Sequence, residues 1–279
     1  MKIRKLAALA AVGLASVALL AACSSKGSST SSTKSQTITV ATSADSNPYE
    51  YTNSKGQLQG FEIDLLKKID ADLPQYNFKF TTTQDSSILL ALDGGHAQIA
   101  ANNFGKTPER ETKYLFTYPE LEGVNAIFSS TKNPITTVAG LFGKTTEIPT
   151  GSNYGAIMEA WNKSNSSKQI KISYSQNSLT DRLQEISTGK IDFLFADKKA
   201  AENLLKEHSI TGVTDKIPTD LKTYPQFKTY SYFILPSNQK TLQAAMNKEL
   251  KKFAQDGTLK SLSEKYFGDN QVPEASQYN

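Results

Sequence analysis

Three polar segments of this 279-residue sequence carry side chains suited to binding a small charged molecule. The segment 102–110 ends in Arg110, whose planar guanidinium can clamp a carboxylate through two parallel hydrogen bonds. The segment 149–154 contains Ser152 and Asn153 and leads into an expected helix, whose first backbone amides attract anions. Ala196-Asp197 offers a carboxylate. Together these groups suit an α-amino acid, with Arg110 and backbone amides for its carboxylate and Asp197 for its ammonium.

Each segment also has a purely structural explanation. Arg110 lies between two glutamates and would be an ordinary solvated residue on that ground alone. Ser152 or Asn153 can simply cap a helix, and Asp197 is a suitable N-cap residue as well. Capping and anion binding are compatible, so these alternatives stay open.

The expected secondary structure places all three segments directly after strands. The apolar or alternating runs 97–101, 145–148 and 191–195 precede them. Strands and helices alternate along the chain, which predicts parallel βαβ units. The expected elements are strands 37–42, 78–82, 169–174 and 229–235 and helices 61–73, 85–93, 153–161, 179–187, 198–207, 238–254 and 258–266. In open α/β sheets ligands bind beyond the carboxyl ends of the strands.

This order predicts two α/β domains of similar build. The first comprises 37–124 and 231–279, and the second comprises 125–230. If the last two helices pack on the first domain, the chain crosses between the domains twice and forms a two-stranded hinge. Arg110 and Asp197 then belong to different domains, so a ligand that bridges them would favour domain closure.

The N-terminus predicts export and a lipid anchor. A basic head (KIRK) precedes an apolar run from Leu6 to Leu20, about 15 residues and shorter than the roughly 20 that span a bilayer, so residues 1–22 are expected to be a signal peptide. Leu20-Ala21-Ala22-Cys23 resembles the bacterial lipobox, which implies a lipidated Cys23. Residues 23–36 then form a Ser/Thr-rich tether that holds an extracellular domain at the membrane. The alternative is ordinary secretion with a free cysteine.

Composition excludes several other classes. One Cys and two His leave no disulfide framework and no recognisable zinc spacing. The net charge of +4 includes three cations of the signal segment, which leaves +1 and makes nucleic acid an unexpected partner. We expect no metal, no cofactor and a monomer.

From 37 to 268 the chain resembles the polar amino-acid solute-binding lipoproteins of ABC importers, family 3. The motifs are Pro48-Tyr49-Glu50-Tyr51 with Gly60-Phe61-Glu62-Ile63-Asp64-Leu65, Thr107-Pro108-Glu109-Arg110 with Phe116-Thr117-Tyr118-Pro119, and Gly257-Thr258-Leu259 with Lys265-Tyr266-Phe267-Gly268. The lipobox fits the Gram-positive form of these receptors. The resemblance implies a periplasmic-binding-protein-like fold, with the ligand in the cleft between two domains and delivered to a membrane permease.

The resemblance also implies a set of binding residues. Arg110 would bind the ligand carboxylate and Asp197 its ammonium, with Ser152 and Asn153 around the carboxylate. Gly105 stands where the family usually has Ser or Thr, and Asn103 would compensate. Ser46 and Asp85 occupy positions that often carry pocket aromatics, which suggests a roomier, more polar pocket. Tyr49 and Asn102 complete the expected set. The loop 102–110 is most similar to that of cystine-binding members.

Two other functions remain alternatives at this stage. Dehydratases of the cyclohexadienyl type use the same scaffold and need a positioned general acid, for which Glu120 or Glu122 would be the candidates. The polar surface also permits an adhesin or a sensor domain. For the receptor, replacing Arg110 or Asp197 by Ala is expected to weaken binding and to leave stability almost unchanged.

Overall fold

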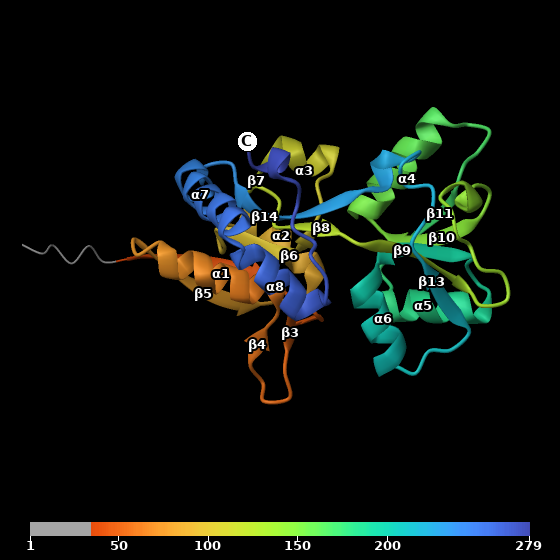
Figure 1. Cartoon of the computed structure of the whole chain (residues 1–279), viewed down its shortest axis with the longest axis horizontal. Coiled ribbons are helices and arrows are strands. Elements are labelled where there is room, and N and C mark those ends of the chain that lie inside the picture. Colours follow the sequence, from red (N-terminus) through yellow and green to blue (C-terminus); the bar gives the residue numbers. More distant parts are fainter. Residues whose placement is uncertain (1–34) are drawn as a thin grey trace, which may run out of the picture. The chain divides into compact units, whose positions relative to one another are not determined.

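The structure, a computed structural model, describes residues 35–279, which form one compact unit. The predicted signal peptide, Cys23 and nearly all of the predicted tether lie outside the described residues. No helix in the described part of the chain is long and apolar enough to cross a bilayer. Two lobes, each built on its own β-structure, make up the unit (Figure 1).

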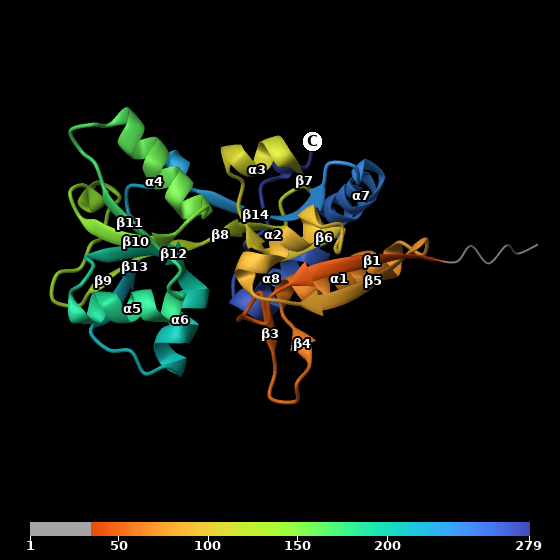
Figure 2. The same ribbon diagram turned by 180° about the vertical axis from the view of Figure 1, so that it is seen from behind.

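The first lobe contains a six-stranded sheet with helices packed against it (Figures 1 and 2). Strand β1 runs parallel to β5 and β6, whereas β14 runs antiparallel to β6, β7 and β8. The strands are β1 (Gln36–Thr42), β5 (Tyr76–Thr82), β6 (Ile99–Phe104), β7 (Tyr114–Phe116), β8 (Leu121–Gly123) and β14 (Thr229–Pro236). The helices are α1 (Phe61–Asp72), α2 (Asp85–Asp93), α3 (Pro108–Lys113), α7 (Lys240–Asp256) and α8 (Thr258–Phe267).

The core of the first lobe follows from the apolar face of α1. Phe61, Leu65, Leu66 and Ile69 are fully buried and pack with residues of α7 and α8, as their helical spacing predicts. Gly60, directly before α1, has a φ of 136°, and a Cβ there would lie 2.1 Å from the carbonyl oxygen of Tyr49. Only glycine permits this close approach. It brings the start of α1 against a small three-stranded sheet of β2 (Asp45–Ser46), β3 (Glu50–Thr52) and β4 (Leu58–Gln59).

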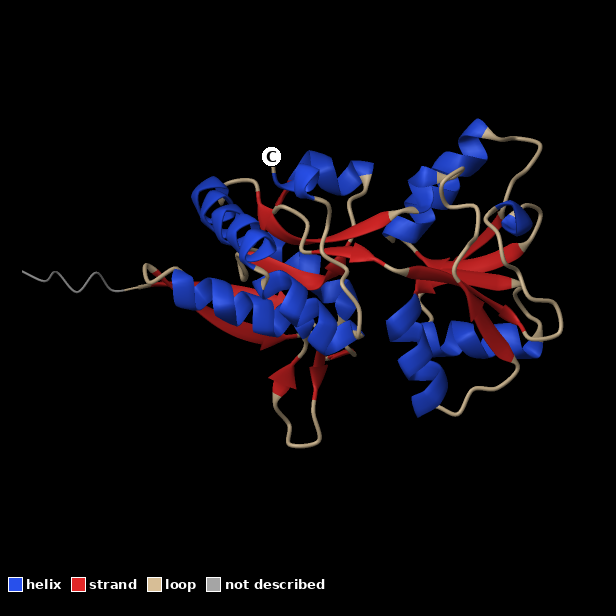
Figure 3. Ribbon diagram, viewed as in Figure 1, coloured by secondary structure: helices blue, strands red, loops and turns tan. Residues whose placement is uncertain are grey.

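The second lobe has two short sheets (Figure 3). Two apolar clusters contain residues of these sheets and of the helices beside them. One sheet pairs β10 (Thr145–Pro149) with β11 (Lys171–Ser175) in parallel. In the other, β9 (Asn125–Ser130) lies between β12 (Phe193–Asp197) and β13 (Val213–Lys216), both antiparallel to it. The helices are α4 (Asn153–Ser164), α5 (Leu179–Thr188) and α6 (Lys198–Glu207); short 3-10 turns are η1 (Ala139–Leu141), η2 (Pro225–Phe227) and, at the C-terminus, η3 (Ala275–Tyr278).

The chain passes between the lobes twice, through β8 to β9 and again into β14. The two crossings are joined by a hydrogen bond of 2.7 Å from Asn125 Nδ2 to Thr229 Oγ1. Helices α7 and α8 pack on the first lobe, as expected. The expectation of parallel strands throughout is wrong for β9, β12, β13 and β14. The strands β7, β8 and β13 and the hairpin β2 to β4 were not expected, because each is short and carries little apolar periodicity.

Candidate functional site

Arg110 is fixed by its own loop in the first lobe. Thr107 caps α3 by accepting the Arg110 backbone N–H at 3.2 Å. Arg110 Nη1 donates to the Gly105 carbonyl at 2.8 Å, and the guanidinium lies 5.1 Å from the centre of the Phe104 ring. Burial lowers the pKa of Arg110, but a guanidinium stays charged throughout the physiological range. The side chain is therefore held as an oriented cation rather than left as a solvated residue.

This guanidinium lines a cavity of about 520 Å³ between the lobes. Arg110 Nη2 donates to the Gly151 carbonyl of the second lobe at 3.1 Å. With two of its five N–H groups used in this way, Arg110 retains three for another acceptor. The cavity brings together six of the predicted residues, namely Asp85, Asn102, Asn103, Arg110, Ser152 and Asn153.

The second-lobe wall of this cavity is the start of α4. Ser152 is the N-cap and accepts the Gly155 N–H at 3.0 Å. The amides of Asn153 and Tyr154 belong to the first turn and have no intrahelical carbonyl to bind. The Tyr154 hydroxyl donates to Asn125 Oδ1 at 2.9 Å, which ties the helix to the crossing strand. The Ser152 cap thus leaves these two first-turn amides available to another acceptor.

Gly105 packs against the side chain of Asn153, which lines the cavity. A Cβ at position 105 would lie 2.5 Å from Asn153 Nδ2. A side chain at position 105 has no room in this arrangement unless Asn153 moves.

Asp197 is placed differently from Arg110. It is the last residue of β12 and the N-cap of α6, with Oδ1 accepting the Ala200 N–H at 2.8 Å. Oδ2 accepts the hydroxyl proton of Tyr49, from the first lobe, at 2.7 Å. Burial raises the pKa of Asp197, and both of these hydrogen bonds oppose that rise. Asp197 and Tyr49 are buried and do not line the Arg110 cavity.

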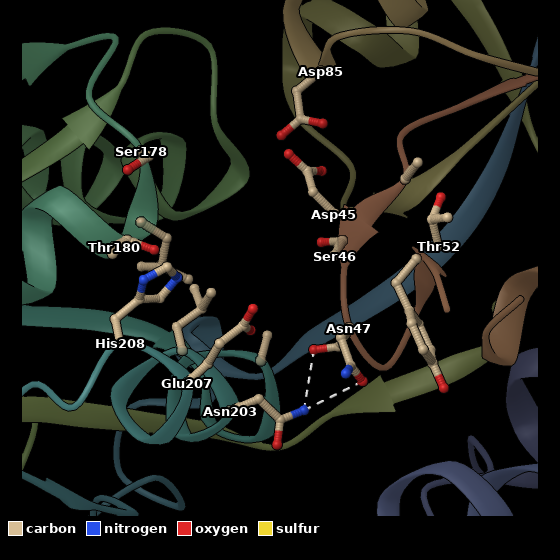
Figure 4. A pocket seen from close by; sticks show the side chains of 15 residues that line it. Asp45, Ser46, Asn47, Thr52, Asp85, Ser178, Thr180, Asn203, Glu207 and His208 are labelled. Atoms are coloured by element: carbon tan, nitrogen blue, oxygen red, sulfur yellow. Dashed lines mark hydrogen bonds between the residues drawn. The ribbon is translucent and has the colours of Figure 1, made fainter. Parts of the chain in front are cut away.

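A second cavity of about 490 Å³ lies beside Asp197's helix (Figure 4). Ser46 and Asp85 line it, and Asp85 belongs to the walls of both cavities. The carboxyl groups of Asp45 and Asp85 face each other, and burial together with Asp45 raises the pKa of Asp85. Sequence reasoning missed Asp45, Asn47, Asn203, Glu207 and His208.

The missed residues bring the lobes together at a second point. Asn203 Nδ2 donates to the Asn47 carbonyl at 3.2 Å, and Asn203 and Glu207 are four residues apart on one face of α6 (Figure 4). This spacing of four residues was the sequence feature that could have identified Asn203 and Glu207 as neighbours on one helix face. Within residues 35–279, no group of His, Cys, Asp and Glu is arranged to hold a metal ion.

The residues suggested for an enzyme face neither cavity. Glu120 is completely buried, and Glu122 pairs with Lys228 at 3.0 Å. Neither belongs to the wall of the Arg110 cavity or of its neighbour. A general acid must reach the reacting group, so these positions give no support to the enzyme alternative.

Comparison with known proteins supports a receptor. The L-cystine-binding protein TcyJ of Bacillus subtilis (strain 168) is 30% identical over 236 residues, 84% of each chain. The L-cystine-binding protein TcyK of the same strain is 27% identical and covers 84% of this chain and 85% of its own. These relatives are binding proteins and not enzymes, which confirms the expectation for this chain.

The fold agrees with solved structures. One comes from a study of glutathione import in Gram-positive bacteria via GshT and the cystine ABC importer TcyBC of Streptococcus mutans; it is 31% identical, with a TM-score of 0.74, and covers 87% of this chain and 99% of its own. A putative L-cystine ABC transporter protein from Listeria monocytogenes is 27% identical with a TM-score of 0.69, covering 85% and 98%. The profile of the bacterial extracellular solute-binding proteins, family 3, matches residues 38–269. The chain therefore belongs to that family and is the substrate-binding component of an amino-acid ABC importer, with two α/β domains.

Proposed function

We propose that this protein captures a polar amino acid outside the cell, with L-cystine as the first candidate, and delivers it to its ABC permease. The observation that carries the proposal is Arg110, a half-buried cation held on the wall of a cavity that both lobes line. The cystine-binding relatives support the choice of ligand.

Both lobes contact the ligand in this proposal. The ligand carboxylate binds the remaining N–H groups of Arg110 and the first-turn amides of α4. Its ammonium is assigned to Asp197, which is buried outside both cavities in this structure, so binding there requires the ligand to gain access to the carboxylate that now accepts Tyr49 and Ala200. Because Arg110 and Asp197 lie on different lobes, ligand binding favours closure of the two domains onto each other. The first domain comprises 37–124 and 231–279, and the second comprises 125–230.

Asp85 supports a ligand longer than a simple amino acid. Its side chain lines both cavities, so the distal half of a two-ended ligand passes beside it toward Ser46. L-Cystine is two-ended and carries a second ammonium group, which suits the neighbouring carboxyl groups of Asp45 and Asp85. Glutathione is a second candidate because the 31% identical structure comes from a study of its import.

A binding screen tests this function. Calorimetry and thermal shift on the full-length chain in mild detergent should single out one ligand among the amino acids, L-cystine and glutathione, because a ligand stabilises the folded state by mass action. Mass spectrometry of the recovered ligand should show no conversion. A screen without any selective ligand, or steady turnover, would contradict the proposal.

The proposal includes a lipid anchor at Cys23 and a monomeric receptor. The lipobox-like Leu20-Ala21-Ala22-Cys23 supports the anchor. Replacing Cys23 by Ser should release the protein from the membrane fraction into the medium, because one missing lipid site removes the stable attachment. Full retention of this variant after a salt wash would contradict the anchor.

A further inference from the structure

Three glutamates meet in the interior of the first lobe, behind the Arg110 loop. Glu50 begins β3, Glu62 is the second residue of α1, and Glu120 precedes β8. All three side chains are completely buried, and Glu62 lies within hydrogen-bonding reach of both other carboxyl groups. We call these three residues the glutamate cluster. It does not line either cavity.

The glutamate cluster has no counter-ion. None of the ion pairs within residues 35–279 includes Glu50, Glu62 or Glu120. Four of its carboxyl oxygens are buried without a donor from outside the cluster. The titratable groups that surround it are Asp85, Tyr49 and Tyr278, and none of them is a cation.

Protons shared within the cluster reduce its buried negative charge and supply the missing donors. Burial is the main cause that raises the pKa of all three carboxyl groups, and the neighbouring Glu62 raises those of Glu50 and Glu120 further. Glu62 is the member whose charge is favoured, because hydrogen bonds from Glu120, Glu50 and Asn103 each lower its pKa. Protonated Glu50 and Glu120 are then the donors and Glu62 is the acceptor.

Glu62 in turn holds the binding loop. Its Oε1 accepts the backbone N–H of Asn103 at 2.8 Å. Asn103 has a φ of 47°, a left-handed conformation that is uncommon for non-glycine residues but that asparagine tolerates better than most. Asn103 lines the Arg110 cavity, and the neighbouring Asn102 accepts a hydrogen bond of 2.8 Å from Ser43 Oγ, which also lies 3.4 Å from Glu50. The cluster therefore contacts the loop directly at Asn103 and reaches Asn102 only through the Ser43 hydroxyl.

We infer that Glu62 is a positioning residue of the binding loop, held as one negative charge between protonated Glu50 and Glu120, and that loss of a shared proton displaces Asn103 and weakens ligand binding. The inference rests on the proposed function only in taking the loop 102–110 as a ligand contact. It makes receptor affinity dependent on pH through residues that never touch the ligand.

The sign of the pH dependence follows from proton binding. In an unfolded chain these glutamates release their protons near pH 4.5, whereas the folded cluster keeps protons at higher pH. Above pH 4.5 the folded state thus binds more protons than the unfolded state, so stability falls as pH rises until the cluster itself deprotonates. Deprotonation of the cluster places two negative charges side by side. Their repulsion displaces Glu62 and with it Asn103, so the affinity for the ligand falls at alkaline pH.

Four variants of the full-length chain test this inference. Glu62→Gln removes the central charge at constant size. Glu120→Gln and Glu50→Gln replace the two protonated partners by permanent N–H donors. The matched control is Glu249→Gln, since Glu249 is also buried but pairs with Lys252 at 3.5 Å.

The first measurements need no ligand. As pH rises from 5 to 9, the melting temperatures of the wild type and of Glu249→Gln should fall. The melting temperature of Glu120→Gln should fall less and should be about 3 °C above that of the wild type at pH 8. Hydrogen exchange at pH 7, followed by mass spectrometry of a peptide covering 99–106, should be at least about tenfold faster in Glu62→Gln and unchanged in Glu249→Gln. If Glu62→Gln fails to fold, the melting profiles of Glu120→Gln and Glu50→Gln test the inference instead.

Calorimetry with L-cystine then links the cluster to binding. At pH 7 we expect Glu62→Gln to bind L-cystine about tenfold more weakly than the wild type. Between pH 7 and pH 9 the affinity of the wild type should fall, and the affinity of Glu120→Gln should fall less. Parallel pH profiles in all variants, or unchanged exchange in Glu62→Gln, would overturn the inference. A wild type that does not bind L-cystine would count against the proposed ligand only, because the ligand-free measurements still decide the role of the cluster.

Discussion

The two lobes position their binding segments by different means. In the second lobe, Ser152 and Asp197 each cap the helix that follows them, so both are fixed by amides three residues further along the chain. In the first lobe, Asn103 is held by Glu62, which is 41 residues away, and by the side chain of Ser231 in β14, which is 128 residues away. All three residues nevertheless lie in or shortly after a strand, and Asn103 and Ser152 line the same cavity between the lobes.

This difference indicates where the receptor is sensitive to substitution. A local cap depends on one side chain and its own helix, so its loss has a limited and predictable effect. A loop in a left-handed conformation depends on several distant partners at once, and each of them affects the position of the others. We expect the second lobe to respond to single replacements at its caps, and the first lobe to respond to replacements far from the ligand.

The largest effect is expected at Asp197. Asp197→Ala removes the cap of α6 and leaves the buried Tyr49 hydroxyl without its acceptor, so the free energy of unfolding should fall by about 2 to 3 kcal/mol. This corrects the expectation from sequence that stability would barely change. Asp197→Asn keeps an oxygen for the cap and should lose less than about 1 kcal/mol, while both variants bind at least about 30-fold more weakly. Chemical unfolding and calorimetry measure the two effects, and wild-type affinity in Asp197→Asn would refute the ammonium site.

Arg110→Ala should weaken binding by at least about 30-fold, which corresponds to about 2 kcal/mol. The ligand carboxylate loses its cation, whereas the folded chain loses only hydrogen bonds to the Gly105 and Gly151 carbonyls. Arg110→Lys keeps the charge without the planar fork and should be intermediate. Calorimetry checks the series, and equal affinities in all three proteins would show that the carboxylate binds elsewhere.

Gly105→Ala tests the close approach between the lobes. A methyl group there meets Asn153 at 2.5 Å, so closure should be impeded and affinity should fall about tenfold, the low end of the usual cost of overpacking. Asn153→Gly provides the matched change, because Asn153→Ala would keep a Cβ that lies 2.7 Å from the added methyl group. In the double variant Gly105→Ala/Asn153→Gly the clash is absent, and calorimetry should show that Gly105→Ala no longer weakens binding; strictly additive effects would contradict the steric explanation.

The smallest effect is expected for Tyr49→Phe. It removes the hydrogen bond between the Tyr49 hydroxyl and Asp197 but keeps the ring that packs against Phe267. The closed arrangement loses one bond between lobes, so affinity should fall about fivefold, near 1 kcal/mol. Tighter binding in this variant would show instead that the hydroxyl competes with the ligand ammonium for Asp197.

The amino-acid sequence determined those features that depend on neighbouring residues. Helical periodicity placed α1, α7 and α8, and polar residues after apolar runs identified Arg110, Ser152 and Asp197. The alternation of strands and helices indicated two α/β domains. These signals are readable because a helix face, a cap or a strand end involves residues only a few positions apart.

Only the tertiary structure decided which of these groups meet. It placed Arg110 on a cavity wall with Asn153, paired Asp197 with Tyr49, and left no room for a side chain at Gly105. It also brought Glu50, Glu62 and Glu120 together from three separate elements. In the sequence nothing indicates that these glutamates lie together, since burial of a charged group depends on the packing of distant elements and leaves no local pattern.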